Sequence, residues 1–179
     1  MNELKLWVVY MITILSMVIW GVSYIWVDQA LEFYKPETIA AIRVFIAAIF
    51  MLILSMVLGK LQRVTPRDLL LLMLFALFDP FAYFLCESFG IMHSNPVTAS
   101  VIIATIPLFV PISAFLVLKE RISIFNIFGI VVSFVGVLFV IVSGKLQLEV
   151  APLGLLLLFG AVFCAILYNF FLKNLISRY

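Results

Sequence analysis

Residues 6–27 read LWVVYMITILSMVIWGVSYIWV, an apolar stretch that contains no charged residue. A helix needs about 20 apolar residues to cross the roughly 30 Å hydrocarbon core of a membrane. Lys5 precedes the stretch, as in a secretory signal peptide, but the apolar run is too long and no small-residue cleavage site follows it. We therefore expect a retained transmembrane helix at this position.

Five further apolar runs of similar length follow along the chain. They cover residues 38–58, 69–92, 97–118, 122–142 and 151–172. Hydrophobic residues make up 66% of the 179 residues and charged residues only 11%, whereas soluble domains average about 25% charged residues. So few charges cannot cover a water-facing surface, and a net charge of +2 indicates no nucleic-acid partner. The predicted fold class is an all-α polytopic membrane protein, with six transmembrane helices in a lipid bilayer.

Basic residues are distributed unevenly between the two sets of loops. Eight lie before the first run, after the second, after the fourth and after the sixth, while the opposite loops hold only Lys35 and Lys145. An excess of Lys and Arg marks the cytoplasmic side of a membrane protein. We predict a multi-pass protein of the cell (inner) membrane, with its N-terminus and residue 179 both in the cytoplasm.

The sixth run is similar to the first when the two are laid together at an offset of 144 residues. Identical residues then meet at three positions: Val18 and Val162, Tyr24 and Tyr168, and Leu31 and Leu175. A repeat with an odd number of helices is inverted in its second copy, as in many transporters. We expect residues 1–148 to form a first five-helix repeat and residues 149–179 to be the first helix of a truncated second repeat.

Several short motifs follow one another in a fixed order along the chain. They are Trp20-Gly21, Pro36-Glu37-Thr38, Ala41-Ile42-Arg43, Glu87-Ser88-Phe89-Gly90-Ile91, Pro107-Leu108 and Gly129-Ile130. In this order and spacing the chain resembles the EamA branch of the drug/metabolite transporter superfamily over nearly its whole length. The resemblance implies ten helices in two inverted repeats, so that the missing second repeat of the same chain is a partner of residues 1–179.

The resemblance also implies a function. Members of that family are secondary or facilitative transporters of small organic solutes, such as amino acids, other metabolites or drugs, and many are exporters. We therefore expect a small-molecule substrate and no cofactor, and we keep a homodimer among the expected arrangements.

Two acids and a tyrosine in the third run are spaced four residues apart. This spacing places Asp79, Tyr83 and Glu87 on one face of a straight helix. A charge at the centre of a bilayer costs roughly 2.5–3.5 kcal/mol on insertion scales, so these acids should face protein or water. We take the three residues as candidates for a substrate or coupling-ion site, with Trp20 and Tyr24 as an aromatic wall. The structural alternative is that each acid is protonated or paired and only holds helices together.

Arg43 and Glu87 lie at similar depths in their predicted helices. Counting the helical rise places each roughly 8 Å below the outer boundary of the membrane. A pair costs less than two isolated charges, so the matched depth predicts an ion pair between them. Such a pair is either structural or a gate on the outer side that opens when the two charges separate.

Three prolines, Pro80, Pro107 and Pro111, lie inside the third and fourth runs. Each proline removes a backbone donor, which frees the carbonyls of Ala76, Ile103 and Pro107 respectively. We expect helix breaks there, which are either simple kinks or places where carbonyls face the substrate.

The fourth run also carries a row of small residues, Ala99, Ser100 and Ala104. Small side chains allow neighbouring helices to approach closely in a membrane. We expect this row to serve helix packing.

The competing functional class is an intramembrane enzyme that uses Asp79 and Glu87 as paired acids. A straight helix would hold them about 12 Å apart, too far to share a proton. His93 is the only histidine, which gives no metal site, and no phosphate-binding glycine loop is present. We therefore expect no catalytic or metal-binding residues, and we keep a membrane scaffold built on the buried acids as a further alternative.

Overall fold

The computed structural model describes residues 3–61, 64–118, 123–142 and 151–176, and all the contacts and cavities of the fold belong to these residues. They form the helices α1 (Glu3–Leu31), α2 (Pro36–Val57), α3 (Pro66–Ala76), α4 (Tyr83–Met92), α5 (Pro96–Ile103), α6 (Ile106–Leu118), α7 (Ile124–Val142) and α8 (Pro152–Ile176). A kinked segment, η1 (Leu77–Ala82), joins α3 to α4, and its backbone is not helical at Asp79. No strand occurs within the described ranges.

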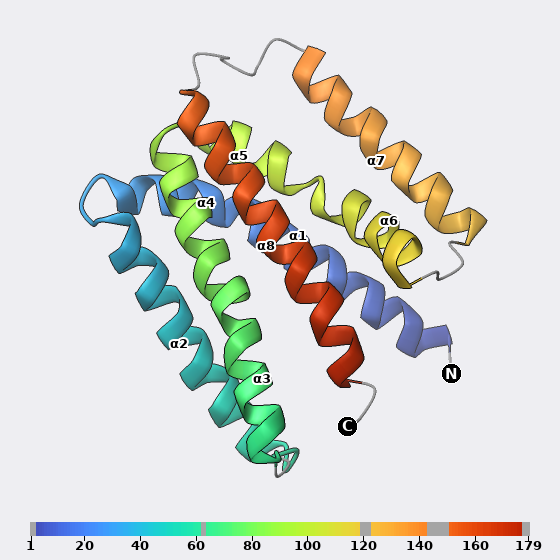
Figure 1. The fold of residues 1–179 in the computed structure, drawn as a ribbon. Helices are drawn as coiled ribbons and strands as arrows, with labels where there is room; N and C mark the ends of the chain where they lie inside the picture. The colour runs from blue at the N-terminus through green and yellow to red at the C-terminus, as the bar shows by residue number, and fades with distance from the viewer. Residues whose placement is uncertain (1–2, 62–63, 119–122, 143–150, 177–179) are drawn as a thin grey trace.

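The predicted all-α polytopic membrane fold is confirmed. Four continuous stretches are long and apolar enough to cross a membrane: Leu6–Leu31, Pro36–Val57, Pro66–Met92 and Pro152–Leu172. The two other predicted spans correspond to α7 and to the interrupted pair α5–α6. Together these six segments alternate in direction, so the start of α1 and the end of α8 lie at the same end of the bundle (Figure 1).

Local sequence fixes where several spans begin. Pro36, Pro66 and Pro96 each occupy the first turn of a helix, where the missing N–H costs no hydrogen bond. The side chains of Thr65 and Asn95 cap α3 and α5, because their oxygens accept from backbone N–H groups at 3.3 and 2.8 Å. These signals end the loops sharply and place the polar groups outside the apolar spans.

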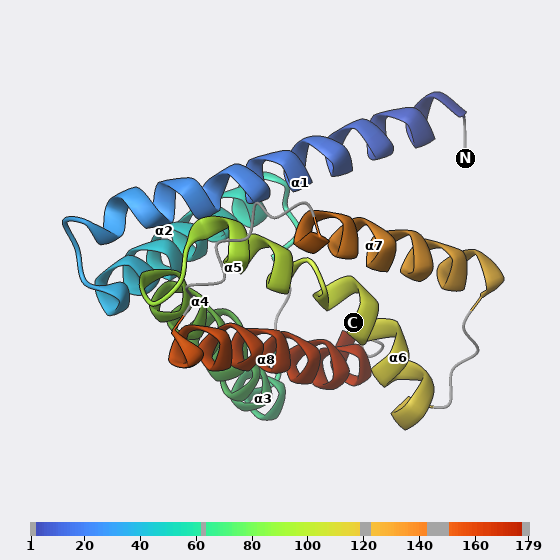
Figure 2. The same ribbon diagram turned by 90° about the horizontal axis from the view of Figure 1, so that it is seen from above.

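Helix α8 is the central element of the bundle. Its most extensive contacts are with α4, and it also packs against α3, η1, α5 and α6. Seen from above, α1 lies on one side and α3 and α8 on the other, with α5 between them (Figure 2). Within the 18-residue apolar stretch of α8, 22% of the residues are buried inside the bundle. The corresponding share in α1 is 6%, so most of α1 faces the outside of the bundle.

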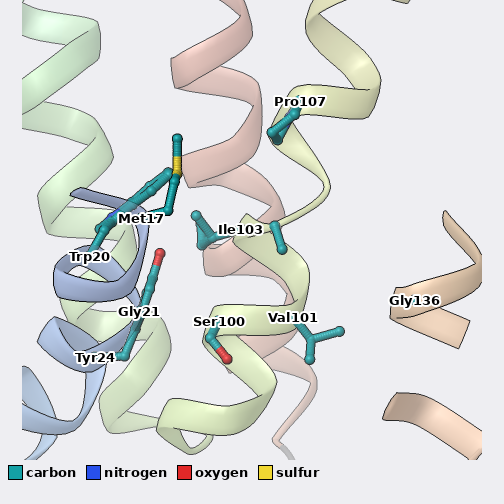
Figure 3. A pocket seen from close by; sticks show the side chains of 10 residues that line it. Met17, Trp20, Gly21, Tyr24, Ser100, Val101, Ile103, Pro107 and Gly136 are labelled. Atoms are coloured by element: carbon teal, nitrogen blue, oxygen red, sulfur yellow. The ribbon is translucent and has the colours of Figure 1, made fainter. Parts of the chain in front are cut away.

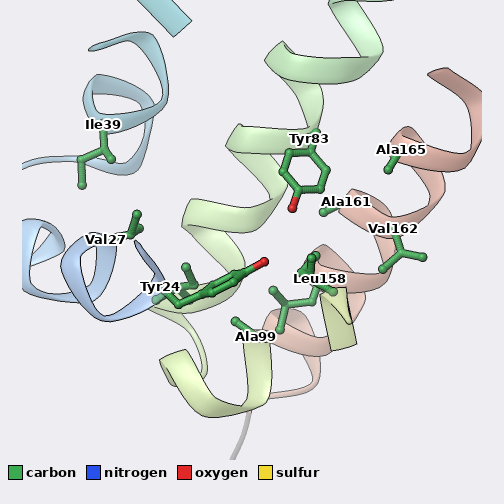
Figure 4. Close-up of a cluster of buried hydrophobic side chains, with 11 residues drawn as sticks. Tyr24, Val27, Ile39, Tyr83, Ala99, Leu158, Ala161, Val162 and Ala165 are labelled. Carbon is green, nitrogen blue, oxygen red and sulfur yellow. The ribbon is translucent and has the colours of Figure 1, made fainter. Parts of the chain in front are cut away.

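The core is small and lies where α1, α4, α5 and α8 meet (Figure 4). Ala99, Leu158 and Ala161 have no exposed surface. One glycine on each helix allows α4 and α8 to approach closely: a side chain at Gly154 of α8 would meet the backbone carbonyl of His93, and one at Gly90 of α4 would meet Leu158.

Some predicted features lie outside the described residues. They are the repeat boundary within residues 143–150, and the basic loop residues Arg63, Lys119, Arg121, Lys145 and Arg178. The predicted repeat organisation and membrane orientation therefore stay predictions.

Candidate functional site

Arg43 of α2 and Glu87 of α4 form an ion pair, in which Nη1 of the arginine donates to Oε2 of the glutamate. The Glu87 side chain is 1% exposed and that of Arg43 is 23% exposed. Oε1 of Glu87 accepts a hydrogen bond of 3.1 Å from the Tyr83 hydroxyl. The Arg43 guanidinium also lies 3.9 Å from the centre of the Phe84 ring. Both carboxylate oxygens therefore have a donor, as a charged group inside a membrane requires.

Tyr24 brings α1 to this cluster. Its side chain is 4% exposed, and its hydroxyl points into the same space as that of Tyr83 (Figure 4). Among the described residues the Tyr24 hydroxyl has no hydrogen bond of good geometry. The hydroxyl nevertheless interacts with the Tyr83 hydroxyl and the Glu87 carboxylate, so Tyr24 extends the buried polar cluster.

Asp79 does not join the cluster. It lies in η1 with an extended backbone, at φ −140° and ψ 120°, directly before Pro80. The prediction that Asp79, Tyr83 and Glu87 share the face of one straight helix is therefore wrong, because the proline bends the chain between them. Asp79 is half-buried in a segment that packs against α8, and no hydrogen bond or ion pair to it occurs in the described part of the chain.

A cavity of about 550 Å³ lies between α1, α5, the start of α6 and α7 (Figure 3). Its lining residues are Met17, Trp20, Gly21, Tyr24, Ser100, Val101, Ile103, Ala104, Pro107 and Gly136. Trp20 and Tyr24, which the sequence suggested as an aromatic wall, both line it. Tyr24 thus belongs to the cavity wall and also to the buried polar cluster, so one side chain links the two features.

The row of small residues in α5 has two different roles. Ala99 is fully buried in the core, as expected for helix packing. Ser100 and Ala104 instead line the cavity, a role that the expectation of helix packing missed. The signal that could have identified them is their position within two turns before Pro107, in a span where a break was expected.

The break itself forms part of the cavity wall. Helix α5 ends at Ile103 and α6 begins at Ile106, so the chain is not helical at Ala104 and Thr105. Pro111 lies inside α6, which continues through it, so the break predicted at that proline is absent. Prolines are tolerated inside membrane helices where neighbouring helices and small local adjustments satisfy the freed carbonyl.

Most of the chain, up to the end of α7, matches a known protein family. A family model described as the EamA-like transporter family covers residues 6–142. The chain belongs to this family. The resemblance inferred from the motifs is therefore confirmed, and this EamA-like chain is a multi-pass membrane protein.

Two relatives are longer than the EamA-like chain and match it over part of their length. An uncharacterized transporter of Archaeoglobus fulgidus is 29% identical over 177 residues, which are 98% of this chain and 60% of the relative. The uncharacterized transporter YcxC of Bacillus subtilis is 31% identical over 174 residues, which are 95% of this chain and 55% of the relative. The chain therefore spans little more than half the length of these proteins. No solved structure matches it significantly.

Proposed function

We propose that this chain is the first part of a secondary or facilitative transporter that carries a small organic solute across the membrane. The observation that carries the proposal is the buried Arg43–Glu87 pair with Tyr83, set inside an apolar bundle next to a cavity. Ionisable groups are expensive in membrane helices and are kept mainly where they line solute or ion pathways. Transporter sites also tend to lie near the bilayer midplane beside broken helices, like the break between α5 and α6.

In this proposal the Arg43–Glu87 pair acts as a latch. It joins α2 to α4, and Tyr24 brings α1 against the same cluster, so these three helices cannot separate without breaking it. Alternating access would combine rocking of one repeat against the other with a movement of α2 away from α4 inside the first repeat, and this second movement would open the latch on the outer side. Residues 1–148 would form the first repeat, and α8 would start the second repeat from its central position. Export, and solutes such as amino acids, other metabolites or drugs, follow from the family and belong to the proposal.

An intramembrane enzyme with paired acids finds less support in this geometry. Both Glu87 oxygens are occupied by Arg43 and Tyr83, and the bend at Pro80 separates Asp79 from them. Within the described residues, no group of three or more histidines, cysteines or acids is placed to hold a metal ion. The remaining alternative, a membrane scaffold, predicts no solute flux at all.

We propose Asp79 as the coupling residue, because it is an acid without a partner in the described chain, at a proline bend in the middle of a span. Asp79→Asn keeps the shape of the side chain and removes its titration. In liposomes with a pH-sensitive dye inside and an imposed gradient of amino acids or related metabolites, we expect solute-linked proton movement to fall at least about tenfold in this variant. Solute exchange without a gradient should persist.

Unchanged proton movement in folded Asp79→Asn protein would show that Asp79 is structural. Asp28→Asn is a suitable control, because this half-buried acid lies near the end of α1, away from the middle of its span. Absence of any solute flux in the unmodified protein with both repeats present would favour the scaffold.

The proposed orientation has its own test. After replacing Cys86 and Cys164, a single cysteine at Ser94, between α4 and α5, should react with an impermeant maleimide in intact cells. A single cysteine at Lys60, after α2, should react only after permeabilisation, because the basic loops should face the cytoplasm. The reverse pattern of labelling would contradict a cytoplasmic N-terminus.

A further inference from the structure

The cavity between α1, α5, α6 and α7 selects against charge. None of its ten lining residues carries a charged side chain. Arg43 and Glu87 are outside it and are bonded to each other. An ion that entered this cavity would lose its water without gaining a counter-ion, which is strongly unfavourable. Met17, Trp20 and Tyr24 instead offer a thioether and two aromatic rings, which favour an apolar molecule with a ring.

The residues of the helix break line this cavity, and the break leaves some of their backbone carbonyls without their usual helical partners. Pro107 has no N–H to bond the carbonyl of Ile103, and the N–H of Leu108 bonds the carbonyl of Thr105 rather than that of Ala104. Between the described residues, no backbone N–H donates to the carbonyl of Ala104, and the carbonyl of Ile103 lacks the N–H that would lie four residues further on. Ser100 adds a third acceptor, because its hydroxyl donates to the Val97 carbonyl at 2.8 Å and keeps its own lone pairs.

Unpaired carbonyls at the middle of a membrane span are costly unless something donates to them. The Ala104 carbonyl, the weakened Ile103 site and the Ser100 hydroxyl one turn before it can therefore accept from a donor outside the described chain. We infer that the cavity binds an uncharged, mainly apolar ring compound whose hydrogen-bond donor lies against the break between α5 and α6. This inference rests on the proposed function, because it names the class of molecule that the transporter would carry.

Four para-substituted bromobenzenes of similar size test the two parts of this inference, the need for a hydrogen-bond donor and the exclusion of charge. They are para-bromophenol, para-bromotoluene, para-bromobenzoate and para-bromobenzylammonium: a neutral donor, its isostere without a donor, an anion and a cation. Bromine quenches tryptophan fluorescence at contact, and Trp20 lines the cavity whereas Trp7 and Trp26 are 69% and 58% exposed. The full chain with Trp7→Phe and Trp26→Phe, in lipid nanodiscs, reports on the cavity. The full chain with Trp7→Phe and Trp20→Phe reports on probe dissolved in the lipid.

We expect saturable quenching of Trp20 and only linear quenching of Trp26. After correction for partition into the bilayer, the phenol should bind about five- to tenfold more tightly than the toluene, the value of one hydrogen bond. The anion and the cation should bind at least about tenfold more weakly than the phenol. Equal affinities for phenol and toluene, binding of either ion as tight as that of the phenol, or the absence of saturation at Trp20 would each overturn the inference.

A proline variant tests the acceptors directly. Pro107→Ala lets the helix continue, so that the N–H groups of residues 107 and 108 can satisfy the carbonyls of Ile103 and Ala104; the preference for phenol over toluene should then fall to about twofold or less while toluene binding persists. Pro111→Ala is the matched control, because this proline lies one turn further along α6 and outside the cavity lining, and the preference should survive. A preference that persists in folded Pro107→Ala protein would overturn the role of the break.

The four probes are also compared on protein that keeps Pro107, and this comparison decides the ligand class even if Pro107→Ala does not fold. Quenching reports binding and does not depend on flux. A negative result would therefore remove this inference and leave the Asp79→Asn flux test of the proposed function intact.

Discussion

Glu87→Ala is expected to destabilise the protein by about 3–5 kcal/mol, because it leaves the Arg43 guanidinium inside the bundle without its partner. Arg43→Ala should have an effect of similar size, since Glu87 is 1% exposed and would keep only its hydrogen bond from Tyr83. The measurement is the free energy of unfolding in mixed detergent micelles, followed by circular dichroism as the fraction of denaturing detergent is raised.

The exchange of the two charges separates pairing from simple damage. Arg43→Glu combined with Glu87→Arg should recover part of the lost stability, because the attraction is restored in the opposite sense. Glu37→Gln is the matched control: this exposed acid lies in the first turn of α2, and its loss should cost less than about 1 kcal/mol. A double variant no more stable than the worse single variant would argue against an energetic role for the pair.

Gly154→Ala is expected to weaken the docking of α8 on α4. The new Cβ would lie 2.6 Å from the carbonyl oxygen of His93 and 2.9 Å from its carbon, so the backbone itself has to move. Overpacking of this kind costs about 1–3 kcal/mol. The loss should appear as a lower unfolding midpoint and as faster proteolysis around Ala151, just before α8.

Gly160→Ala on the same helix is the matched control. Its Cβ would meet only the Cys86 sulfur, at an ordinary contact distance of 3.6 Å. Alanine favours a helix over glycine by about 1 kcal/mol, so this variant should be neutral or slightly more stable. Equal stabilities for the two variants would show that the approach of α8 to His93 is not tight in solution.

The sequence by itself determined the fold class and the positions of the spans. Hydrophobicity and helix-start signals act along the chain, so runs such as residues 6–27 and the prolines at Pro36, Pro66 and Pro96 are readable without knowledge of their neighbours. The contact between Arg43 and Glu87 was also predictable, because the depth of a residue in the membrane follows from its distance along the span to the end of the helix. Family membership followed from the order of short motifs, and the family match over residues 6–142 agrees with it.

Only the tertiary structure decided how the candidate site is assembled. A proline shows that a helix is interrupted but not in which direction it bends or whether it bends at all. The sequence therefore could not show that Asp79 leaves the face of Tyr83 and Glu87, or that α6 continues through Pro111. The cavity likewise depends on how far α1 stands from α5 and α7, a distance fixed by side chains on several helices at once. For that reason the sequence could not reveal that Tyr24 joins the cavity to the buried ion pair, or that Ser100 and Ala104 line the cavity instead of packing between helices.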